Sequence, residues 1–584
     1  MADPRAGTAT ARPAVLARPS PVRMVLAHAR HASRAFLRTP IAAFFTLAFP
    51  LVWLVAITLI TGNMTITTPV GSMRLAQVLT PVAAVFAAVM AAYTTPAIGI
   101  ALARERGELK RLRGTPAPPW TFVAGRIVSA AGIALLGVLV MVAAGVLFYG
   151  VQIVWSALPA AVVTLLVGIA CFAALGMAVA AVLPTSQMVQ AFTTGTVIVL
   201  GFVSEMFTGD ADLPPVLDAV GWIFPLRHFV TALRDTFIPF HAGTQFAWDH
   251  LAVMAAWGVA GVVVAARFFT WAPRREAARR PARTRPRTRP HPGVTRGRRS
   301  TAGLVTGQVG HAVRTEWRDV GSVFFAVAFP VLLLVLIGSI WRGALIGGLP
   351  LPQVLAPGMA VYGAAITAFA NMPETTATAR DRGVLKRLSG TPLPMWAYVT
   401  GRVGAALSTA LVTLVLVVAV GVPLFGIEVS PRGLPALALT FVLGTACLAA
   451  LGLALVALTP NAKTVSVAGL GILLPLAILS GLFPLGPEEP PVVRAIASVF
   501  PLQHFGDALD EALRATTWFP VAWHHLAVML AWGVAGALVA ARFLSVEPGG
   551  RARVHRSAGR AAQGSGAGSR SSVTPSRSSA RPGP

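Results

Sequence analysis

Long apolar runs dominate the chain, and its polar residues are gathered in the segments between them. A helix that crosses a membrane needs roughly 20 mostly apolar residues, because each residue adds about 1.5 Å across a hydrocarbon core about 30 Å thick. The first group of such runs lies near 41–61, 77–101, 122–148, 158–183, 187–207 and 251–270. The second group lies near 321–341, 353–377, 398–426, 433–458, 464–484 and 525–545. The pattern predicts an all-α polytopic membrane protein with twelve transmembrane helices as two parallel six-helix repeats.

The composition favours a membrane protein over a soluble enzyme. Hydrophobic residues make up 55% of the chain and charged residues only 12%, whereas soluble domains carry about 25% charged residues. The 48 Lys and Arg residues exceed the 21 Asp and Glu residues, which gives a formal net charge of +27. The basic tracts lack the interleaved aromatic residues of single-strand nucleic-acid binders. The excess charge therefore indicates a membrane surface and no nucleic acid.

Basic residues are concentrated in every second segment between the expected spans. They lie before the first span, between the second and third, and after the sixth, where eleven arginines stand between Arg274 and Arg299. The opposite segments are poor in basic residues, with Arg74 in the first and none in 149–158. Because basic residues stay on the cytoplasmic side, we expect a multi-pass protein of the cell membrane with both termini in the cytoplasm.

An internal repeat relates the two groups of spans. The run Arg104 to Pro116 (RERGELKRLRGTP) returns as Arg380 to Pro392 (RDRGVLKRLSGTP), at an offset of 276 residues. Cys171 returns as Cys447 at the same offset, and Phe224-Pro225-Leu226 returns as Phe500-Pro501-Leu502. Each group has six spans, an even number, so the two copies share one orientation in the membrane.

The repeat and the low-complexity segments define the expected domains. A basic disordered N-terminus covers 1–20, the first six-span unit 21–271, and an Arg/Pro-rich cytoplasmic linker 272–300. The second six-span unit covers 301–546, and a disordered Gly/Ser/Arg-rich tail covers 547–584. Proline-rich and charged stretches of this kind bury too little apolar surface to fold.

The charged loop after the second span of each half is the strongest candidate site. Its leucines are three residues apart on one face of a short helix, which Thr-Pro then ends. An ordinary positive-inside anchor would need only the charges, but both copies also keep Gly, Leu and Thr-Pro in register. We therefore interpret the loop as a docking element for a cytoplasmic protein. Its candidate residues are Arg104, Glu105, Arg106, Gly107, Leu109, Lys110, Arg111, Leu112, Thr115 and Pro116, with Arg380, Asp381, Arg382, Gly383, Leu385, Lys386, Arg387, Leu388, Thr391 and Pro392.

Two further segments are duplicated. The segment before the first span carries Val22, Leu26, Ala29 and Phe36 on one helical face and arginines mostly on the other, the pattern of a helix in the membrane interface. Its copy runs from about 305 to 319. The segment between the fifth and sixth spans is too apolar for a free loop and too broken for a span. We interpret it as a re-entrant hairpin at the outer side, with Pro225, Leu226, Pro501 and Leu502 as its candidate residues.

Two acidic residues, Glu205 and Glu374, fall inside the expected spans, and neither of them is duplicated. Glu205 lies near the outer end of the fifth span and Glu374 near the inner end of the eighth. Ionisable residues in a span indicate function by default, although these two are also compatible with placement at the membrane interface. The sequence has no phosphate-binding G-x-x-x-x-G-K-[ST] loop, no Cys/His metal motif and no G-x-S-x-G nucleophile motif. We expect no catalytic site and no metal site in this chain.

These features together resemble the membrane subunits of ABC-2 type ABC transporters. In that family an amphipathic helix precedes the first of six spans, a charged coupling helix lies between spans 2 and 3, and re-entrant helices lie between spans 5 and 6. Glu105 to Pro116, Asp381 to Pro392, Pro225-Leu226 and Pro501-Leu502 carry the resemblance. Two six-span units are fused here, so one chain resembles a complete transmembrane unit.

The resemblance implies a transport subunit, driven by a separate ATPase. Two copies of that ATPase would bind ATP and Mg and dock beneath the two coupling helices, while this chain holds no cofactor. The resemblance implies export, and it leaves the substrate open. Two alternatives remain at this point: an ion-coupled secondary transporter, which needs charged residues within its spans, and a membrane scaffold or sensor that transports nothing.

The docking interpretation makes one prediction. Replacing Glu105 and Asp381 with Lys is expected to abolish partner-dependent transport and to leave the chain inserted and stable. Unchanged transport in the double variant would remove the coupling assignment.

Overall fold

The computed structural model of the chain describes residues 20–38, 43–68, 71–115, 117–207, 213–240, 246–271, 301–482 and 491–545. Of the segments predicted to be disordered, residues 1–19, 272–300 and 547–584 lie outside these residues. The candidate residue Pro116 also lies outside them.

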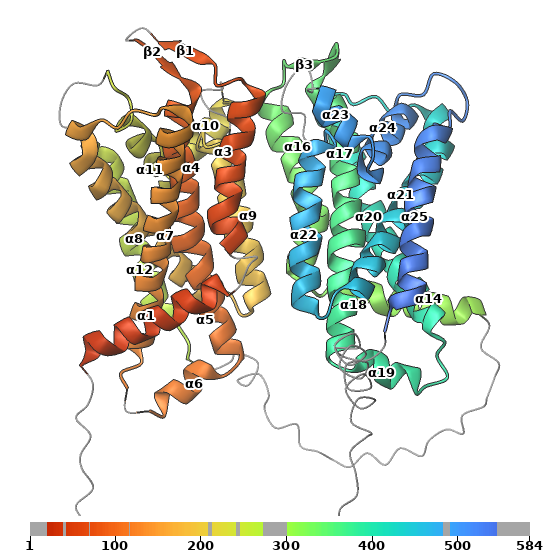
Figure 1. Cartoon of the computed structure of the whole chain (residues 1–584), viewed down its shortest axis with the longest axis horizontal. Coiled ribbons are helices and arrows are strands. Elements are labelled where there is room, and N and C mark those ends of the chain that lie inside the picture. Colours follow the sequence, from red (N-terminus) through yellow and green to blue (C-terminus); the bar gives the residue numbers. More distant parts are fainter. Residues whose placement is uncertain are drawn as a thin grey trace, which may run out of the picture.

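The described part of the chain is helical apart from two short hairpins, which confirms the predicted fold class (Figure 1). In the first half the elements are α1 (Pro21–Leu37), η1 (Phe44–Ala48), α3 (Phe49–Ile60), β1 (Thr65–Thr68), β2 (Gly71–Arg74), α4 (Leu75–Val89), η2 (Met90–Thr94), α5 (Thr95–Glu105), α6 (Glu108–Arg113), α7 (Trp120–Tyr149), η3 (Trp155–Ala157), α8 (Leu158–Val182), α9 (Ser186–Val203), α10 (Pro215–Ile223), α11 (Pro225–Asp235) and α12 (Trp248–Phe268).

The second half repeats this order. Its elements are α14 (Thr301–Glu316), α15 (Val320–Val323), η4 (Phe324–Ala328), α16 (Phe329–Ile340), β3 (Leu345–Ile346), β4 (Leu349–Pro350), α17 (Leu351–Ala365), η5 (Ile366–Asn371), α18 (Met372–Asp381), α19 (Val384–Ser389), α20 (Met395–Phe425), η6 (Pro431–Gly433), α21 (Leu434–Leu458), α22 (Ala462–Leu479), α23 (Pro491–Ala497), α24 (Pro501–Leu513) and α25 (Trp523–Phe543).

Eleven helices of the described chain are long and apolar enough to cross a membrane. They coincide with the second to twelfth predicted spans. The first predicted span, 41–61, appears as η1 followed by α3, with a shorter apolar helix over Thr46–Leu59. The second span of each half is one long helix in three parts, because a π-helical turn, η2 or η5, interrupts it.

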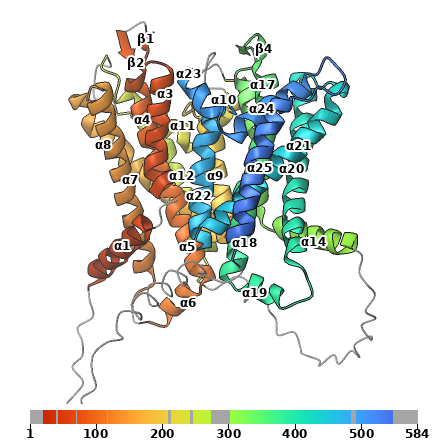
Figure 2. The ribbon, with the colours of Figure 1, turned by 45° about the vertical axis from the view of Figure 1, so that its right-hand side comes forward.

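The two halves stand side by side with their long helices roughly parallel (Figures 1 and 2). One end of the bundle carries the two β-hairpins and the short helices α10 and α23, and we call it the hairpin end. The other end carries α1, α6, α14 and α19, and we call it the arginine-rich end. Helix α1 lies across the arginine-rich end of α7, and α14 lies across the same end of α20. Helices α9 and α22 lie on the sides of their halves that face each other.

Glycines allow the closest helix contacts inside each half. Gly176 of α8 faces the backbone oxygen of Tyr93 in η2, and a Cβ at this glycine would lie well inside contact distance of that oxygen. The repeat position Gly452 meets Pro373 and the backbone oxygen of Ala368 in the same way. Small residues are the usual means of bringing membrane helices together, since van der Waals contact and not the hydrophobic effect drives their association.

We expect Gly176→Ala to destabilise the fold. The new methyl group would overpack against backbone atoms, at a cost of about 1–3 kcal/mol. Gly132→Ala is the matched control, because Gly132 also lies inside a long helix but has nothing within 4 Å of the added Cβ. That variant should be as stable as the parent or more stable, since Ala favours a helix by about 1 kcal/mol over Gly. The measurement is the temperature at which detergent-solubilised protein loses its monodisperse state, and an equal response of the two variants would contradict this account.

Candidate functional site

The charged loops form two short helices, α6 and α19, that project from the arginine-rich end (Figure 1). Each begins at a glycine with positive φ, +69° at Gly107 and +66° at Gly383. Only glycine adopts this left-handed conformation without strain, which explains why both copies keep it. The chain turns here from the second span into a short helix along the arginine-rich end.

One face of each short helix is fixed to the bundle. Leu109 is fully buried and packs in a cluster with Ile100, Met177 and Val189, while Leu385 is its buried counterpart in the second half. The opposite face is exposed and basic. It carries Lys110, Arg111 and Arg113 on α6, and Lys386 and Arg387 on α19.

Arg104 and Arg380 lie inside the protein and not on the exposed basic faces of the loops. Arg104 is fully buried, and its guanidinium donates to the carbonyl oxygens of Ala180 and Leu183 at 2.6 and 2.5 Å. Arg380 donates in the same way to Val456 and Thr459 at 2.6 and 2.9 Å. These carbonyls belong to the last turns of α8 and α21 and the residues that follow. A helix leaves its last four carbonyls without partners, so each arginine caps the end of the fourth span of its half.

The acidic neighbours cap the beginning of the next span. Glu105 accepts from the backbone N–H of Ser186 at 2.7 Å and from its hydroxyl at 2.8 Å. Asp381 accepts from the N–H of Ala462 at 2.7 Å. A carboxylate is favourable at a helix N-terminus, where unpaired N–H groups and the helix dipole meet. Two consecutive residues therefore join the second span to the end of the fourth and the start of the fifth.

This geometry changes the expectation for charge reversal at Glu105 and Asp381. A lysine there would remove a helix cap, worth about 0.5–2 kcal/mol, so a loss of stability is expected beside any loss of transport. The exposed Lys110, Arg111, Lys386 and Arg387 test docking more cleanly, because the structure places their side chains on the surface.

The fifth spans connect these caps to the interface between the halves. Gln187, in the first turn of α9, donates to the carboxylate of Asp319 at 2.9 Å. Lys463, its repeat position in α22, donates to the backbone oxygen of Arg38 at 3.1 Å. Each fifth span thus touches the junction between the amphipathic helix and the first span of the other half. Closer to the hairpin end, Gly195 of α9 packs against the ring of Phe324 in the other half.

The predicted outer segment is a pair of helices in each half. Helices α10 and α11 meet at Phe224 with a bend of 85°. Pro225 and Leu226 begin α11, and Pro501 and Leu502 begin α24; all four are buried.

A histidine pair fastens each of these segments to the last span. His228 Nε2 donates to the carbonyl of Trp222 at 2.9 Å, so in the neutral ring its Nδ1 accepts from His250 Nδ1 at 2.7 Å. His504, Ser498 and His525 repeat this arrangement. These pairs were not predicted from the sequence, although each histidine recurs at its repeat position.

Glu205 and Glu374 both have polar side-chain partners, and the two residues lie toward opposite ends of the bundle. Glu205 follows α9 with φ +59° and pairs with Arg227 at 2.5 Å and Arg234 at 3.4 Å. Glu374 lies in the first turn of α18 and accepts from the hydroxyl of Ser466 in α22 at 2.9 Å. Glu205 has no counterpart carboxylate, because its repeat position is Gly481.

The described residues contain no group of three or more His, Cys, Asp or Glu side chains that could hold a metal ion. The geometry is that of a multi-pass membrane protein in which two parallel repeats meet along their fifth spans. The family model for ABC-2 type transporters matches residues 25–238 and 311–513, one region in each half and more than half of the chain. The chain belongs to this family and is an ABC transporter permease with two fused units. In the comparison with curated proteins, no match to this chain was found.

We expect Arg104→Met to destabilise the protein. Methionine keeps most of the side-chain bulk but leaves buried carbonyls without donors, at about 1–3 kcal/mol each. Arg106→Met is the matched control two residues away, because the Arg106 side chain is 62% exposed. Its effect should stay within about 0.5 kcal/mol. Thermal unfolding in detergent measures both, and an Arg104→Met protein as stable as the control would contradict the capping role.

Proposed function

We propose that this chain is the complete transmembrane part of an ATP-driven exporter in the cell membrane, and that two copies of a separate ATPase dock beneath α6 and α19. The observation that carries the proposal is the duplicated connection from these helices to the interface. Helix α6 follows the capping pair Arg104-Glu105, and α19 follows the capping pair Arg380-Asp381. The acidic residue of each pair is hydrogen-bonded to the first residue of the fifth span of its half, α9 or α22. A displacement of α6 or α19 therefore reaches the fifth span of the same half.

The distribution of charge supports an ATPase on the arginine-rich end. Basic residues mark the cytoplasmic side of a membrane protein, and ATP is available there. Both termini lie on this side in the proposed orientation. The exposed faces of α6 and α19 are basic, so we expect the docking surface of the ATPase to be acidic.

ATP supplies the driving force through the partner. Closure of an ATPase dimer on ATP and Mg would bring its two docking surfaces together and stabilise one arrangement of the halves over the other. In the described structure the halves touch at the arginine-rich end through Gln187 with Asp319 and Lys463 with Arg38. Substrate access from the cytoplasm requires these contacts to separate, and α9 and α22 then line the opened path.

The positions of Glu205 and Glu374 support this proposal over an ion-coupled transporter. A proton or ion relay would need acidic groups in succession along the spans. The two carboxylates instead lie toward opposite ends, one paired with two arginines and the other bonded to a serine.

The test is recovery of the ATPase from native membranes after cross-linking, with and without reversal of the exposed basic faces. In the quadruple variant Lys110→Glu, Arg111→Glu, Lys386→Glu and Arg387→Glu, we expect at least a tenfold loss of the co-purified ATPase and of ATP-dependent transport. Thermal stability should be unchanged, since these side chains are exposed. Arg23→Glu with Arg30→Glu on α1 is the control for charge alone.

Undiminished recovery of the ATPase from the quadruple variant would contradict docking at α6 and α19. Recovery of the parent chain without any ATPase after cross-linking would contradict an ATP-driven function. Uptake experiments with ion gradients would then become the next measurement.

A further inference from the structure

An apolar groove opens on the side of the first half, between α7, α8 and the end of α11. Its volume is about 240 Å³. The walls come mainly from two transmembrane helices, and the residues that form them include Leu135, Leu139, Val142, Leu158, Val162 and Leu165. Leu139 is 64% exposed, and Leu135, Leu158 and Val162 are also exposed. The rim therefore faces the hydrocarbon of the membrane.

The floor of the groove offers no polar partner. It is formed by the buried residues Ala84, Leu233 and Thr236. The Thr236 hydroxyl already donates to the carbonyl oxygen of Leu233 at 2.7 Å. Water is excluded by such a lining, and a ligand with charged or hydrogen-bonding groups would lose its solvation here without compensation. Only a hydrocarbon fits this chemistry.

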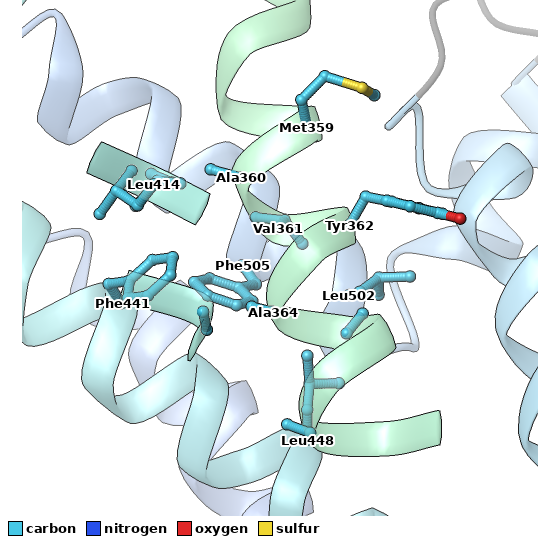
Figure 3. Packing of buried hydrophobic residues seen from close by; sticks show 14 of the residues in the cluster. Met359, Ala360, Val361, Tyr362, Ala364, Leu414, Phe441, Leu448, Leu502 and Phe505 are labelled. Carbon is cyan, nitrogen blue, oxygen red and sulfur yellow. The ribbon is translucent and has the colours of Figure 1, made fainter. Parts of the chain in front are cut away.

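The two halves differ in the residues at the lining positions. The second half has larger residues at three of them, with Phe441 for Leu165, Leu437 for Ala161 and Leu414 for Val138, and smaller residues nearer the rim, such as Ala438 for Val162. The three larger residues are buried, and the ring of Phe441 lies against Phe505 with centroids 5.7 Å apart (Figure 3).

The first half places its aromatic partner elsewhere. There Phe229, the repeat position of Phe505, stacks on Phe172 at 6.1 Å. Phe172 lies seven residues after Leu165, about two helical turns along the same face of α8. The second half has Leu448 at that position. The smaller Leu165 leaves open part of the space that the ring of Phe441 takes up in the second half.

We propose that this groove binds one acyl chain of a phospholipid from the leaflet at the hairpin end. Ile153 and Val154, which follow α7 at the hairpin end, line one side of it, so a chain reaches it from that leaflet. The bilayer supplies such chains in direct contact with the exposed rim. The bound chain contacts α7, α8 and the end of α11 together. The proposal is independent of the ATPase and of transport, so its failure would leave the proposed function untouched.

The test uses the full chain in phosphatidylcholine vesicles that contain a phosphatidylcholine with a photoactivatable diazirine in one acyl chain. After illumination, mass spectrometry maps the labelled peptides. We expect labelling of 135–165 at least fivefold above that of the repeat segment 411–441. Leu165→Phe, which installs the residue of the second half, should reduce the first-half labelling to the level of the repeat segment.

Two further variants complete the experiment. Leu166→Phe adds the same ring at the next residue, which is exposed but does not line the groove, and should leave the labelling unchanged. Phe441→Leu should raise the labelling of 411–441. If Leu165→Phe fails to fold, Ala161→Leu with Val138→Leu fills the groove with the other residues of the second half.

Equal labelling of the two segments in the parent chain would overturn the proposal, because it would reflect ordinary contact with surrounding lipid. Labelling that survives the groove-filling variants would also overturn it. Competition of the label by an apolar solute but not by unlabelled phosphatidylcholine would assign the groove to a different ligand and equally reject an acyl chain.

Discussion

The hydrogen bonds from Arg104 and Arg380 to the ends of α8 and α21 are the interaction on which the arrangement of each half depends. The last carbonyls of a helix have no partner within the helix, and two of those that the arginines bond, Ala180 and Val456, belong to buried residues. A guanidinium supplies several donors in one plane, and its positive charge suits the negative end of the helix dipole. The neighbouring acidic residue, Glu105 or Asp381, accepts a hydrogen bond from a backbone N–H at the start of the next helix. One pair of residues thereby satisfies both ends of a tight turn between two spans.

Under the proposed function, this arrangement would join stability to coupling. Arg104 and Glu105 end α5 and lead directly into α6, so the same residues that close the α8–α9 turn also determine where α6 lies. Any partner that moves α6 acts on α9 through hydrogen bonds and not through a flexible loop. Loss of transport in a variant of the capping residues would therefore report on folding as much as on docking, whereas the basic face of α6 can be changed without touching the caps.

The sequence was sufficient to predict the spans and the short helices between them, but not the β-hairpins, and it was insufficient where partners come from distant helices. Apolar runs of about 20 residues predict spans directly, and the leucines three residues apart after Gly107 and Gly383 predicted a short helix in each loop. From the sequence, Arg104 and Glu105 were grouped with the other charges of the loop, because an exposed and a buried arginine look alike in a sequence. Their partners lie about 80 residues away, on turns whose position depends on helix packing.

The histidine pairs and the lipid-facing groove show the same limit. The pair of His228 with His250 needs a contact between two separate helices. At the groove, Leu165 stands where the second half has Phe441, and Phe172 stands where it has Leu448, along one face of a helix. Each of these positions is an ordinary hydrophobic residue in a span when it is considered alone. Their roles can be recognised only after the structure has shown which side chains meet and the two halves have been compared position by position.

Fusion of the two units allows the halves to differ in how their fifth spans are held. At the arginine-rich end α9 and α22 are fastened alike, by Glu105 and Asp381. At the hairpin end they are not. Glu205 ends α9 in a left-handed conformation that strains a side chain, and two arginines of α11 hold it there. Gly481 takes this conformation without strain and has no side chain with which to form such a pair.

An equal push on α6 and α19 would therefore meet unequal resistance at the hairpin end. The tip of α9 can move only with α11 or after its ion pairs separate, whereas the tip of α22 carries no corresponding charge. Two identical subunits could not carry this difference, because a substitution in one would appear in both. Under the proposed function, the single chain would allow a symmetric driving force from two ATPases to produce an asymmetric opening, in which α22 moves further than α9.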